Sequence, residues 1–214
     1  MHTPSIVLLA TQNEKKRKEL VALADGAFVV RVPSDVGLGD VDVEESGETF
    51  DENASLKARG FLAAWHARSS APPPFDFVIA DDSGIVVDVL DGAPGVRSAR
   101  FARDHGAGSG DADNNALLLA KLHDVDDARR TARFVCHVAI LAVEREELVI
   151  VRGVVEGKVA RDARGEGGFG YDPLFIPDAH PSRRVAELTA DEKHAISHRG
   201  HAMRAAVRAI NAKR

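Results

Sequence analysis

The stretch Phe77-Val78-Ile79-Ala80-Asp81-Asp82-Ser83-Gly84-Ile85-Val86-Val87 sets two adjacent carboxylates between two apolar runs. Short apolar runs of this kind are typical of buried strands. Side chains alternate across a strand, so Asp81 and Asp82 cannot both face the same side of a sheet. One carboxylate can then hold a metal ion or a water molecule, while the other bonds backbone amides. The stretch predicts a buried strand with a polar site at its mouth.

Two interpretations of Asp81-Asp82-Ser83-Gly84 are open from these residues alone. Magnesium favours sparse carboxylate ligation that is completed by waters and by substrate phosphates. Asp and Gly are also common turn residues, so the same segment can be a turn that caps the strand. The surrounding sequence has to decide between the metal site and the turn.

Segments on both sides of this stretch mix helix and strand patterns. Before it, the sequence predicts strands at 5–10 and 27–32, and helices at 14–24 with Asn13 as N-cap and from the capping box Thr49-Phe50-Asp51-Glu52 to about 67. After it, the sequence predicts a helix at 113–122, paired strands at 132–143 and 148–155, a short helix opened by the capping box at 189–192, and a last helix from Ser197 to about 212. Elements mixed in this way predict one α/β domain over residues 1–214, with a mixed sheet.

The composition argues against several classes of protein. A chain of 214 residues can bury a sizeable core, and a formal net charge of −5 argues against a nucleic-acid partner. Cys136 is the only cysteine, so no internal disulfide can form. No apolar stretch approaches the ~20 residues that span a bilayer, and no secretory signal is visible. We expect a soluble, cytoplasmic protein that holds any anionic substrate with local cations, helix N-termini or a metal.

Two polar segments before the Asp81 strand suit a phosphorylated ligand. The strand-to-helix junction Thr11-Gln12-Asn13-Glu14-Lys15-Lys16 offers free backbone amides and a positive dipole end, with Lys16 as an adjacent cation. Glu44 precedes a predicted helix on which Asn53 and Lys57 share one face and can reach a common site. Each segment also has an ordinary interpretation, as a solvated basic face or as surface polarity.

Two further segments follow the Asp81 strand. The segment from Gly165 to Pro173 interleaves glycines with two aromatic residues. Glycine lets the backbone approach a ligand closely, and an exposed aromatic ring offers a stacking platform for a base. A hairpin turn with the aromatics packed inward explains the same residues. Lys193 and the corner Ser197-His198-Arg199-Gly200 present an imidazole and two cations, and Arg suits planar acceptors such as a purine carbonyl edge or a phosphate.

Taken together and in this order, these segments resemble the inosine triphosphate pyrophosphatase family, which hydrolyses non-standard purine nucleoside triphosphates. The matching stretches are TQNEKK at 11–16, EESGETFDENASLKAR at 44–59, ADDSGIVVDVLDGAPGVRSARF at 80–101, GEGGFGYDPLF at 165–175 and AELTADEKHAISHRG at 186–200. The similarity runs over nearly the whole chain. Bacterial members usually read Thr-Gly-Asn-x-Gly-Lys in the first block, where this chain carries Gln12 and Lys15.

The resemblance implies an elongated mixed β-sheet flanked by helices, in two lobes with a central nucleotide cleft, and a homodimer. It also implies hydrolysis of ITP, dITP and XTP between the α and β phosphates, with Mg2+ required and with the nucleoside monophosphate and pyrophosphate as products. Asp82 matches the residue taken as general base and metal ligand, and Glu44 matches the second metal ligand. Asp81 would then be the structural partner that holds the strand in place.

The substrate-binding residues that the resemblance implies form two groups. The triphosphate would be bound by Thr11, Gln12, Asn13, Glu14, Lys15, Lys16, Lys57 and Ser83. Phe169 would stack on the base, and the purine with its 6-oxo group would lie beside Gly170, Tyr171, Asp172, Lys193, His198 and Arg199. Donors that face position 6 would accept a keto oxygen and oppose the amino group of adenine.

Two other functions are weighed against this one. A Maf-like pyrophosphatase of modified pyrimidine nucleotides shares the general architecture, but GGFGYDP at 167–173 and SHR at 197–199 match the purine family. A non-catalytic nucleotide-binding module is the second alternative. Such a module would not need both Asp82 and Glu44 beside a triphosphate, so the sequence favours the enzyme.

Overall fold

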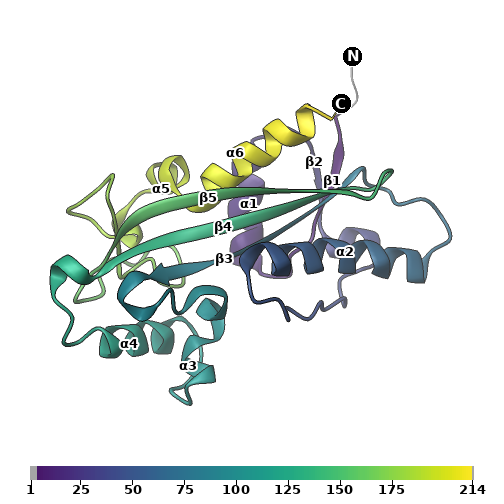
Figure 1. The fold of residues 1–214 in the computed structure, drawn as a ribbon. Helices are drawn as coiled ribbons and strands as arrows, with labels where there is room; N and C mark the ends of the chain where they lie inside the picture. The colour runs from purple at the N-terminus through teal and green to yellow at the C-terminus, as the bar shows by residue number, and fades with distance from the viewer. Residues whose placement is uncertain (1–3, 214) are drawn as a thin grey trace. The chain divides into compact units, whose positions relative to one another are not determined.

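Six strands form one sheet in the computed structural model, which describes residues 4–213 (Figure 1). The order across the sheet is β2-β1-β3-β4-β5-β6, and the bounds are β1 Ile6–Leu9, β2 Val29–Arg31, β3 Phe77–Val87, β4 Thr131–Ala142, β5 Glu147–Val159 and β6 Phe175–Pro177. β1 is parallel to both β2 and β3, with Val7 opposite Val30 and Phe77, whereas β6 is antiparallel to β5. The predicted mixed sheet is confirmed.

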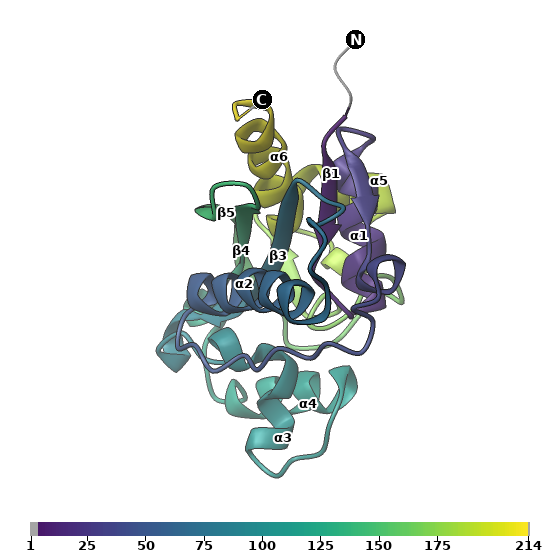
Figure 2. The ribbon, with the colours of Figure 1, turned by 90° about the vertical axis from the view of Figure 1, so that its right-hand side faces the viewer.

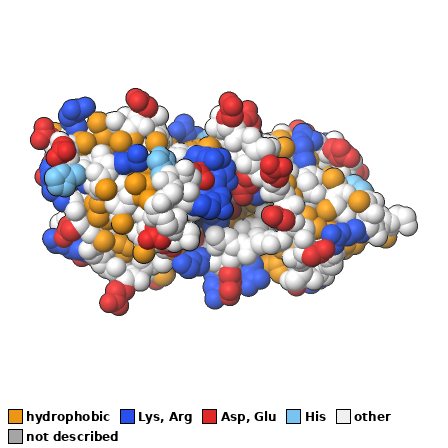
Figure 3. All heavy atoms as spheres, turned by 90° about the horizontal axis from the view of Figure 1, so that it is seen from below, with side chains coloured by type: hydrophobic (Ala, Val, Ile, Leu, Met, Phe, Trp, Pro, Cys, Tyr) orange, Lys and Arg blue, Asp and Glu red, His pale blue; other side chains and the backbone are white. Residues whose placement is uncertain are grey.

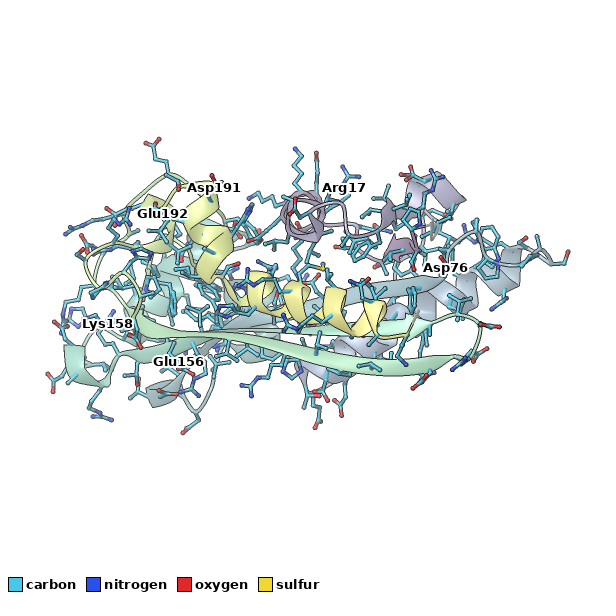
Figure 4. All side chains as sticks on the ribbon, turned by 90° about the horizontal axis from the view of Figure 1, so that it is seen from above. Arg17, Asp76, Glu156, Lys158, Asp191 and Glu192 are labelled. Atoms are coloured by element: carbon cyan, nitrogen blue, oxygen red, sulfur yellow. The ribbon has the colours of Figure 1, made fainter. Side chains whose placement is uncertain are left out.

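Capping residues in the sequence begin three of the helices. The helices are α1 Glu14–Ala24, α2 Phe50–Arg68, α3 Phe101–Asp104, α4 Asp111–Lys121, α5 Ala190–Ile196 and α6 His198–Asn211. The side chain of Asn13 accepts a hydrogen bond from a first-turn amide of α1. Thr49 and Glu52 cap α2 reciprocally, and Thr189 and Glu192 cap α5 in the same way. Glu192, which is labelled in Figure 4, lies in the first turn of α5. The helix starts predicted from these patterns are confirmed.

Contacts within the chain define two compact units, each assembled from separate stretches of sequence. Unit 1 contains the described residues up to Asp82, the stretch Cys136–Gly153 and the described residues from Arg199 onward. Unit 2 contains Ser83–Val135 and Val154–His198. β3, β4 and β5 therefore each contribute residues to both units. The expectation of a single domain over residues 1–214 stays a prediction.

Unit 1 buries an apolar core on each face of its strands. On one face, α1 and α6 pack against β1, β3 and β4 through Val7, Leu9, Leu20, Ala24, Phe77, Ile79, Val138, Ala202, Met203 and Ala206. On the other face, α2 packs against the same strands through Leu8, Ala10, Ala54, Ala58, Phe61, Leu62, Val78, Ala80, Ala139 and Leu141. Figure 2 shows α2 on the opposite side of these strands from α6. Because both faces are covered here, β1 and the first four residues of β3, Phe77–Ala80, are apolar without alternation.

Unit 2 has its own core, which is rich in aromatic residues. Leu118 of α4 is fully buried in it. The ring centroids of Phe134 on β4 and Phe175 on β6 are 4.6 Å apart. Tyr171 is buried in the same core, and its hydroxyl donates a hydrogen bond of 2.9 Å to the carbonyl of Ser98. The glycine-rich segment that contains Tyr171 is thus anchored by an inward-facing aromatic side chain.

β3 corrects one expectation from the sequence. Asp81-Asp82-Ser83-Gly84 is neither a turn nor the mouth of a strand, because β3 continues through it. Gly84 explains the continuity. A Cβ atom at this position would collide with Ser98 Oγ and would lie 2.5 Å from the carbonyl oxygen of Gly95. The missing side chain therefore lets the turn Gly95–Arg100 pack directly against the strand.

Several short elements were not expected from the sequence. The segment 91–110, in which the sequence analysis places no helix or strand, contains the 3-10 turn Gly95–Arg100 and α3. β6 has three residues, which is too few for a readable alternation pattern. Its pairing depends on Gly157 of β5, where a Cβ atom would collide with the carbonyl oxygen of Ile176. The pairing of β6 is therefore specified by a contact with a distant residue.

The helices and the surface carry limited further information. Among the residues that the structure describes, no helix is long and apolar enough to cross a membrane. On the face drawn in Figure 3, Lys and Arg side chains are interspersed with Asp and Glu and with hydrophobic side chains. This mixture of signs agrees with the mild net charge of −5.

Replacement of Gly84 by Ala tests the packing of the turn on β3. We expect Gly84→Ala to lower the free energy of unfolding by about 1–3 kcal/mol, because a well-packed site must shift to hold an added methyl group. Urea denaturation measures the loss. Gly39→Ala is the matched control, since the nearest atom to its added Cβ is 3.5 Å away. An equal loss in both variants, or none in Gly84→Ala, contradicts this account of the strand.

Candidate active site

Asp81 and Asp82 point to opposite faces of β3, as the strand alternation predicts. Asp81 Oδ2 lies 3.3 Å from the Nζ atom of Lys16 on α1 and 3.5 Å from the Nε atom of Arg199 on α6. Asp82 instead accepts a hydrogen bond of 3.2 Å from the side-chain amide of Asn53 on α2. The two adjacent carboxylates therefore belong to different faces of unit 1 and meet different helices.

The Asp81 face holds a row of buried charges of alternating sign. Beyond Asp81, the Nη1 atom of Arg199 donates to Glu19 Oε2 at 3.1 Å, and these two side chains are each only 6% exposed. The row therefore reads Lys16, Asp81, Arg199 and Glu19. Removal of any one member would leave a charge without compensation in a low-dielectric interior. This row ties α1, β3 and α6 together within unit 1.

The charges around Asp81 set its protonation. Burial alone would raise the pKa of the Asp81 carboxyl. The ammonium of Lys16 and the guanidinium of Arg199 outweigh this effect and hold the pKa well below its ordinary value. Asp81 therefore stays ionised, as expected of a structural partner.

The Asp82 face holds a second cluster, formed with α2 and the segment before it. Lys57 Nζ lies 3.8 Å from Asp82 Oδ1 and 3.4 Å from Glu45 Oε1. Asn53, one turn earlier on α2, donates to Asp82 and accepts a hydrogen bond of 2.8 Å from the amide of Gly47. The predicted common face of Asn53 and Lys57 is confirmed, and it is turned toward Asp82 rather than toward solvent.

Asp82 differs from Asp81 in its proton affinity. Burial raises the pKa of Asp82 above its ordinary value, because the attraction of Lys57 and Lys16 does not fully offset the loss of hydration. The negative charges of Glu45 and Asp81 act in the same direction as burial. A buried carboxylate with an increased affinity for protons is suited to accept a proton from water.

The residues around Lys57 have the chemistry of a magnesium site. Asp82 and Glu45 direct carboxylate oxygens toward one cation, the Lys57 ammonium. Oxygen ligands, few in number, suit Mg2+ when waters and phosphates complete its coordination. Glu44, the metal ligand that the resemblance implies, is exposed, whereas Glu45 is partly buried against Lys57. Within residues 4–213, no group of three or more His, Cys, Asp or Glu side chains could hold a metal ion.

The expected phosphate-binding junction lies between β1 and α1. Asn13 caps α1, and its own amide donates a hydrogen bond of 3.2 Å to Thr11 Oγ1. Lys16 points inward to Asp81, whereas Glu14 forms a surface pair of 3.0 Å with Lys18. Arg17, labelled in Figure 4, lies 3.9 Å from the same Glu14 carboxylate. Lys16 of the basic run thus reaches Asp81, whereas Lys18 lies on the solvated face that the alternative interpretation predicted.

Two of the expected base-binding residues of unit 2, Phe169 and Lys193, are held by Asp172. Its Oδ2 atom accepts hydrogen bonds of 2.9 Å from the backbone amide of Phe169 and from Lys193 Nζ. The same ammonium lies 4.8 Å from the centre of the Phe169 ring. Gly168 has a φ of +73°, and a Cβ there would collide with the Asp172 carboxylate. The glycine therefore allows Asp172 to fix both Phe169 and Lys193.

Other predicted residues take distinct places. The His198 ring stacks on Phe134 with centroids 4.8 Å apart and an angle of 12° between the planes. Tyr171 faces the core, so its side chain packs inward, as the hairpin-turn interpretation of the glycine-rich segment predicts. Lys15 is exposed and Ser83 is half-buried on β3. Arg199 contacts Glu19 and Asp81 in unit 1.

Four members of these clusters are not predicted from the sequence: Glu19, Asp111, Asn115 and Glu45, the neighbour of the predicted Glu44. Glu19 is the buried partner of Arg199, and its signal was a charge that precedes Leu20 on a predicted amphipathic helix. Asp111 accepts a hydrogen bond of 2.9 Å from the amide of Gly170, and Asn115 donates one of 2.8 Å to its carbonyl. These two residues on α4 carried no signal, because their partner lies more than fifty positions away.

A family model described as the Ham1 family matches residues 7–209, which is nearly the whole chain. The chain belongs to the Ham1 family. Its relatives include proteins named dITP/XTP pyrophosphatase. The one from Mycolicibacterium paratuberculosis is 45% identical over 210 residues, which cover 96% of this chain and 96% of the relative. The one from Nocardia farcinica is 48% identical over 206 residues, which cover 94% of this chain and 93% of the relative.

Solved structures of Ham1 proteins agree with this fold. A HAM1 protein from Coxiella burnetii is 36% identical and superposes with a TM-score of 0.80 over 97% of this chain and 98% of that chain. At this identity the similarity covers the sequence as well as the path of the backbone. The mixed sheet and helices described above are thus the Ham1 fold.

The two carboxylates of this Ham1 protein predict opposite effects on stability. We expect Asp81→Asn to lower the free energy of unfolding at pH 7 by about 3 kcal/mol or more, because it removes the buried carboxylate that faces both the half-buried Lys16 and the buried Arg199. Asp82→Asn should keep or increase stability, since the fold disfavours the charged form of Asp82. Urea denaturation in EDTA measures both.

The pH dependence gives the control for this pair. A lowered folded-state pKa means that Asp81 stabilises fully above its unfolded value of about 3.9, and that the effect is lost as pH falls through the folded-state pKa. The penalty of Asp81→Asn should shrink below pH 4. The raised pKa of Asp82 has the opposite sign, so any gain from Asp82→Asn at pH 7 should vanish by about pH 3. Equal losses in the two variants at pH 7 contradict the division of roles.

Proposed function

We propose that this protein is a magnesium-dependent pyrophosphatase that hydrolyses ITP, dITP and XTP to the nucleoside monophosphate and pyrophosphate. Relatives named dITP/XTP pyrophosphatase, 45% and 48% identical over nearly the full chain, support this activity. The observation that carries the proposal is the placement of Asp82, buried between the Asn53 amide and the Lys57 ammonium with Glu45 beyond. A carboxylate in such a position can act on a water molecule beside a bound phosphate.

The triphosphate would bind at the junction between β1 and α1. The first-turn amides of α1 point outward from its N-terminus, where the helix dipole favours negative charge. Thr11 and Asn13 shape this turn through the hydrogen bonds described above. Lys16 and Lys57 supply positive charge on the two faces of β3. These groups support the expectation that residues 11–16 and Lys57 bind phosphates.

Asp82 would be the general base. It would accept a proton from water as the water oxygen bonds to the α-phosphorus, and the bond to the bridging oxygen would break to release pyrophosphate. The raised pKa of Asp82 supports this role, because proton transfer is favoured by a base with increased proton affinity. Asn53 holds one carboxylate oxygen, which leaves the other directed toward Lys57.

Asp82 and an acidic residue of the 44–45 pair would hold the magnesium ion. The resemblance points to Glu44, and the contact of Glu45 with Lys57 supports the neighbouring residue. When bound, Mg2+ would neutralise the triphosphate and stabilise the charge that builds on the departing pyrophosphate. Asp81, held ionised by Lys16 and Arg199, would position the strand without contacting the metal.

The residues expected to recognise the base include Phe169, Asp172, Lys193, His198 and Arg199. Phe169 offers a ring with Lys193 beside it, and Asp172 fixes both. Donors that face position 6 of the purine pair with a keto oxygen, whereas the amino group of adenine would leave them unpaired, at a cost of about 1–3 kcal/mol. His198 would belong to this group. Arg199 is engaged with Glu19 and Asp81, so its contact with the purine remains a prediction.

The cell context of this activity follows from the resemblance. A homodimer in the cytoplasm is expected, where removal of ITP, dITP and XTP would keep these nucleotides out of newly made nucleic acids. The oligomeric state is measured by light scattering on the purified protein.

A substrate panel tests the proposed activity. We expect ITP, XTP and dITP with Mg2+ to give monophosphate and pyrophosphate, and ATP to be turned over at least about 100-fold more slowly, as the loss of about two paired donors would give. Products are identified by ion-exchange chromatography. Release of orthophosphate, or equal turnover of ATP and ITP, refutes the proposal.

Asp82→Asn tests the base within the same assay. We expect kcat for ITP to fall by at least about 100-fold, the usual range for loss of a general base. The exposed Asp178 supplies the matched control, Asp178→Asn, which should keep the wild-type kcat. Normal turnover by Asp82→Asn with Mg2+ removes Asp82 from the role of base.

Phe169→Ala tests the base-binding site. We expect KM for ITP to rise by about tenfold or more with a much smaller change in kcat, because base stacking on an aromatic ring contributes about 1–3 kcal/mol. Phe169→Tyr keeps a ring and should keep KM near the wild-type value. A fall in kcat with an unchanged KM would place Phe169 outside the base-binding site.

A further inference from the structure

We infer that Gln12 is a positioning residue that ties the phosphate-binding junction to the acidic segment containing Glu44 and Glu45. This inference rests on the proposed function, because it assigns the two segments to triphosphate and to magnesium. Gln12 lies between Thr11 and Asn13, at a position where bacterial members of the inosine triphosphate pyrophosphatase family usually carry glycine. A glycine has no side chain with which to make the contacts described here.

The side-chain amide of Gln12 reaches two backbone carbonyl groups at once. Its Nε2 atom donates to the carbonyl oxygen of Gly39 at 3.3 Å and to that of Val41 at a shorter distance. The acceptors are 27 and 29 residues away in the sequence. A primary amide nitrogen carries two hydrogen atoms, so one nitrogen can bridge both carbonyls. The Gln12 side chain therefore links the β1–α1 junction to the segment that contains Gly39 and Val41, and we call this link the clamp. The two segments share no helix or strand.

Side-chain contacts, including the packing of Val43 on the core of the α2 face, hold the clamped segment in position. Residues 41–47 form neither helix nor strand. At the start of the segment, Val41 is buried against the α2 face of the sheet beside Ala10, and Gln12 holds its carbonyl. At the other end, the side chain of Asn53 accepts a hydrogen bond of 2.8 Å from Gly47. Glu44 and Glu45 lie between these two attachment points.

The second attachment point leads directly to Asp82. Asn53 binds Gly47 through its oxygen and Asp82 through its nitrogen. The acidic segment is thus fixed to Asp82 at one end by Asn53 and to the phosphate-binding junction at the other end by Gln12. Loss of the Gln12 contacts would release the end that faces the junction. The distance between the carboxylates of the 44–45 pair and Asp82 would then vary, and magnesium would bind more weakly.

Two substitutions separate hydrogen bonding from size. Gln12→Glu keeps the shape but removes both donors and places a carboxylate against two carbonyl oxygens. Gln12→Met keeps the length of the side chain without any polar group. Lys18→Gln is the matched control, because Lys18 is an exposed residue of α1 whose side chain is 72% exposed and pairs with Glu14.

The experiment combines hydrogen exchange with a magnesium titration. Mass spectrometry of the ligand-free protein should show faster amide exchange over residues 38–47 in Gln12→Glu and Gln12→Met, with the rest of unit 1 unchanged. The Mg2+ concentration for half-maximal ITP hydrolysis should rise by about five- to tenfold, the effect of losing one or two ordinary hydrogen bonds. Lys18→Gln should match the wild type in all measurements.

Each result decides a different point. Unchanged exchange over 38–47 in both Gln12 variants overturns the clamp. Faster exchange with an unchanged magnesium midpoint overturns the positioning role. A wild-type protein that fails to release pyrophosphate from ITP refutes the proposed function instead, and the exchange measurement still decides whether the clamp exists.

Discussion

The ionic contacts of buried Asp81 with Lys16 and Arg199 are the constraint on which the rest of unit 1 depends. A carboxylate on β3, an ammonium on α1 and a guanidinium on α6 can be buried only together, since each alone would carry a large desolvation cost. Glu19 completes the set by neutralising the second cation. The positions of both helices relative to β3 are therefore coupled to charge balance as well as to apolar packing. This coupling leaves the other face of the strand available for Asp82.

Sequence analysis succeeded where the determining contacts are local. The capping boxes at Thr49 and Thr189 set helix starts through residues three positions away, so the pattern contains its own cause. Alternation along β3 separated Asp81 from Asp82 for the same reason, because a strand has a period of two. The helical spacing of Asn53 and Lys57 put both on one face of α2. In each case the partners or the geometry lay within a few residues.

Where contacts with distant residues determine the structure, the sequence did not predict it. Asp81-Asp82-Ser83-Gly84 has the composition of a turn, yet it is strand because Ser98 and Gly95 pack in the space that a side chain at Gly84 would fill. β6 depends on Gly157 in the same manner. Glu19 was not predicted as a site residue, because nothing near it in the sequence indicates Arg199 as its partner. Steric fit and charge pairing across the chain leave little trace in local composition.

The pair formed by Glu19 and Arg199 spans 180 positions of sequence, and this separation bears on how the chain folds as it is synthesised. α1 and β3 are made long before α6, so Glu19 and Asp81 must remain hydrated until the final helix is released from the ribosome. A stable sheet cannot close over these two acids earlier, because their burial without Arg199 is unfavourable. Native contacts of such long range also make folding slow. The nascent chain would therefore stay open at α1 until α6 emerges, and it would expose apolar surface to chaperones during that interval.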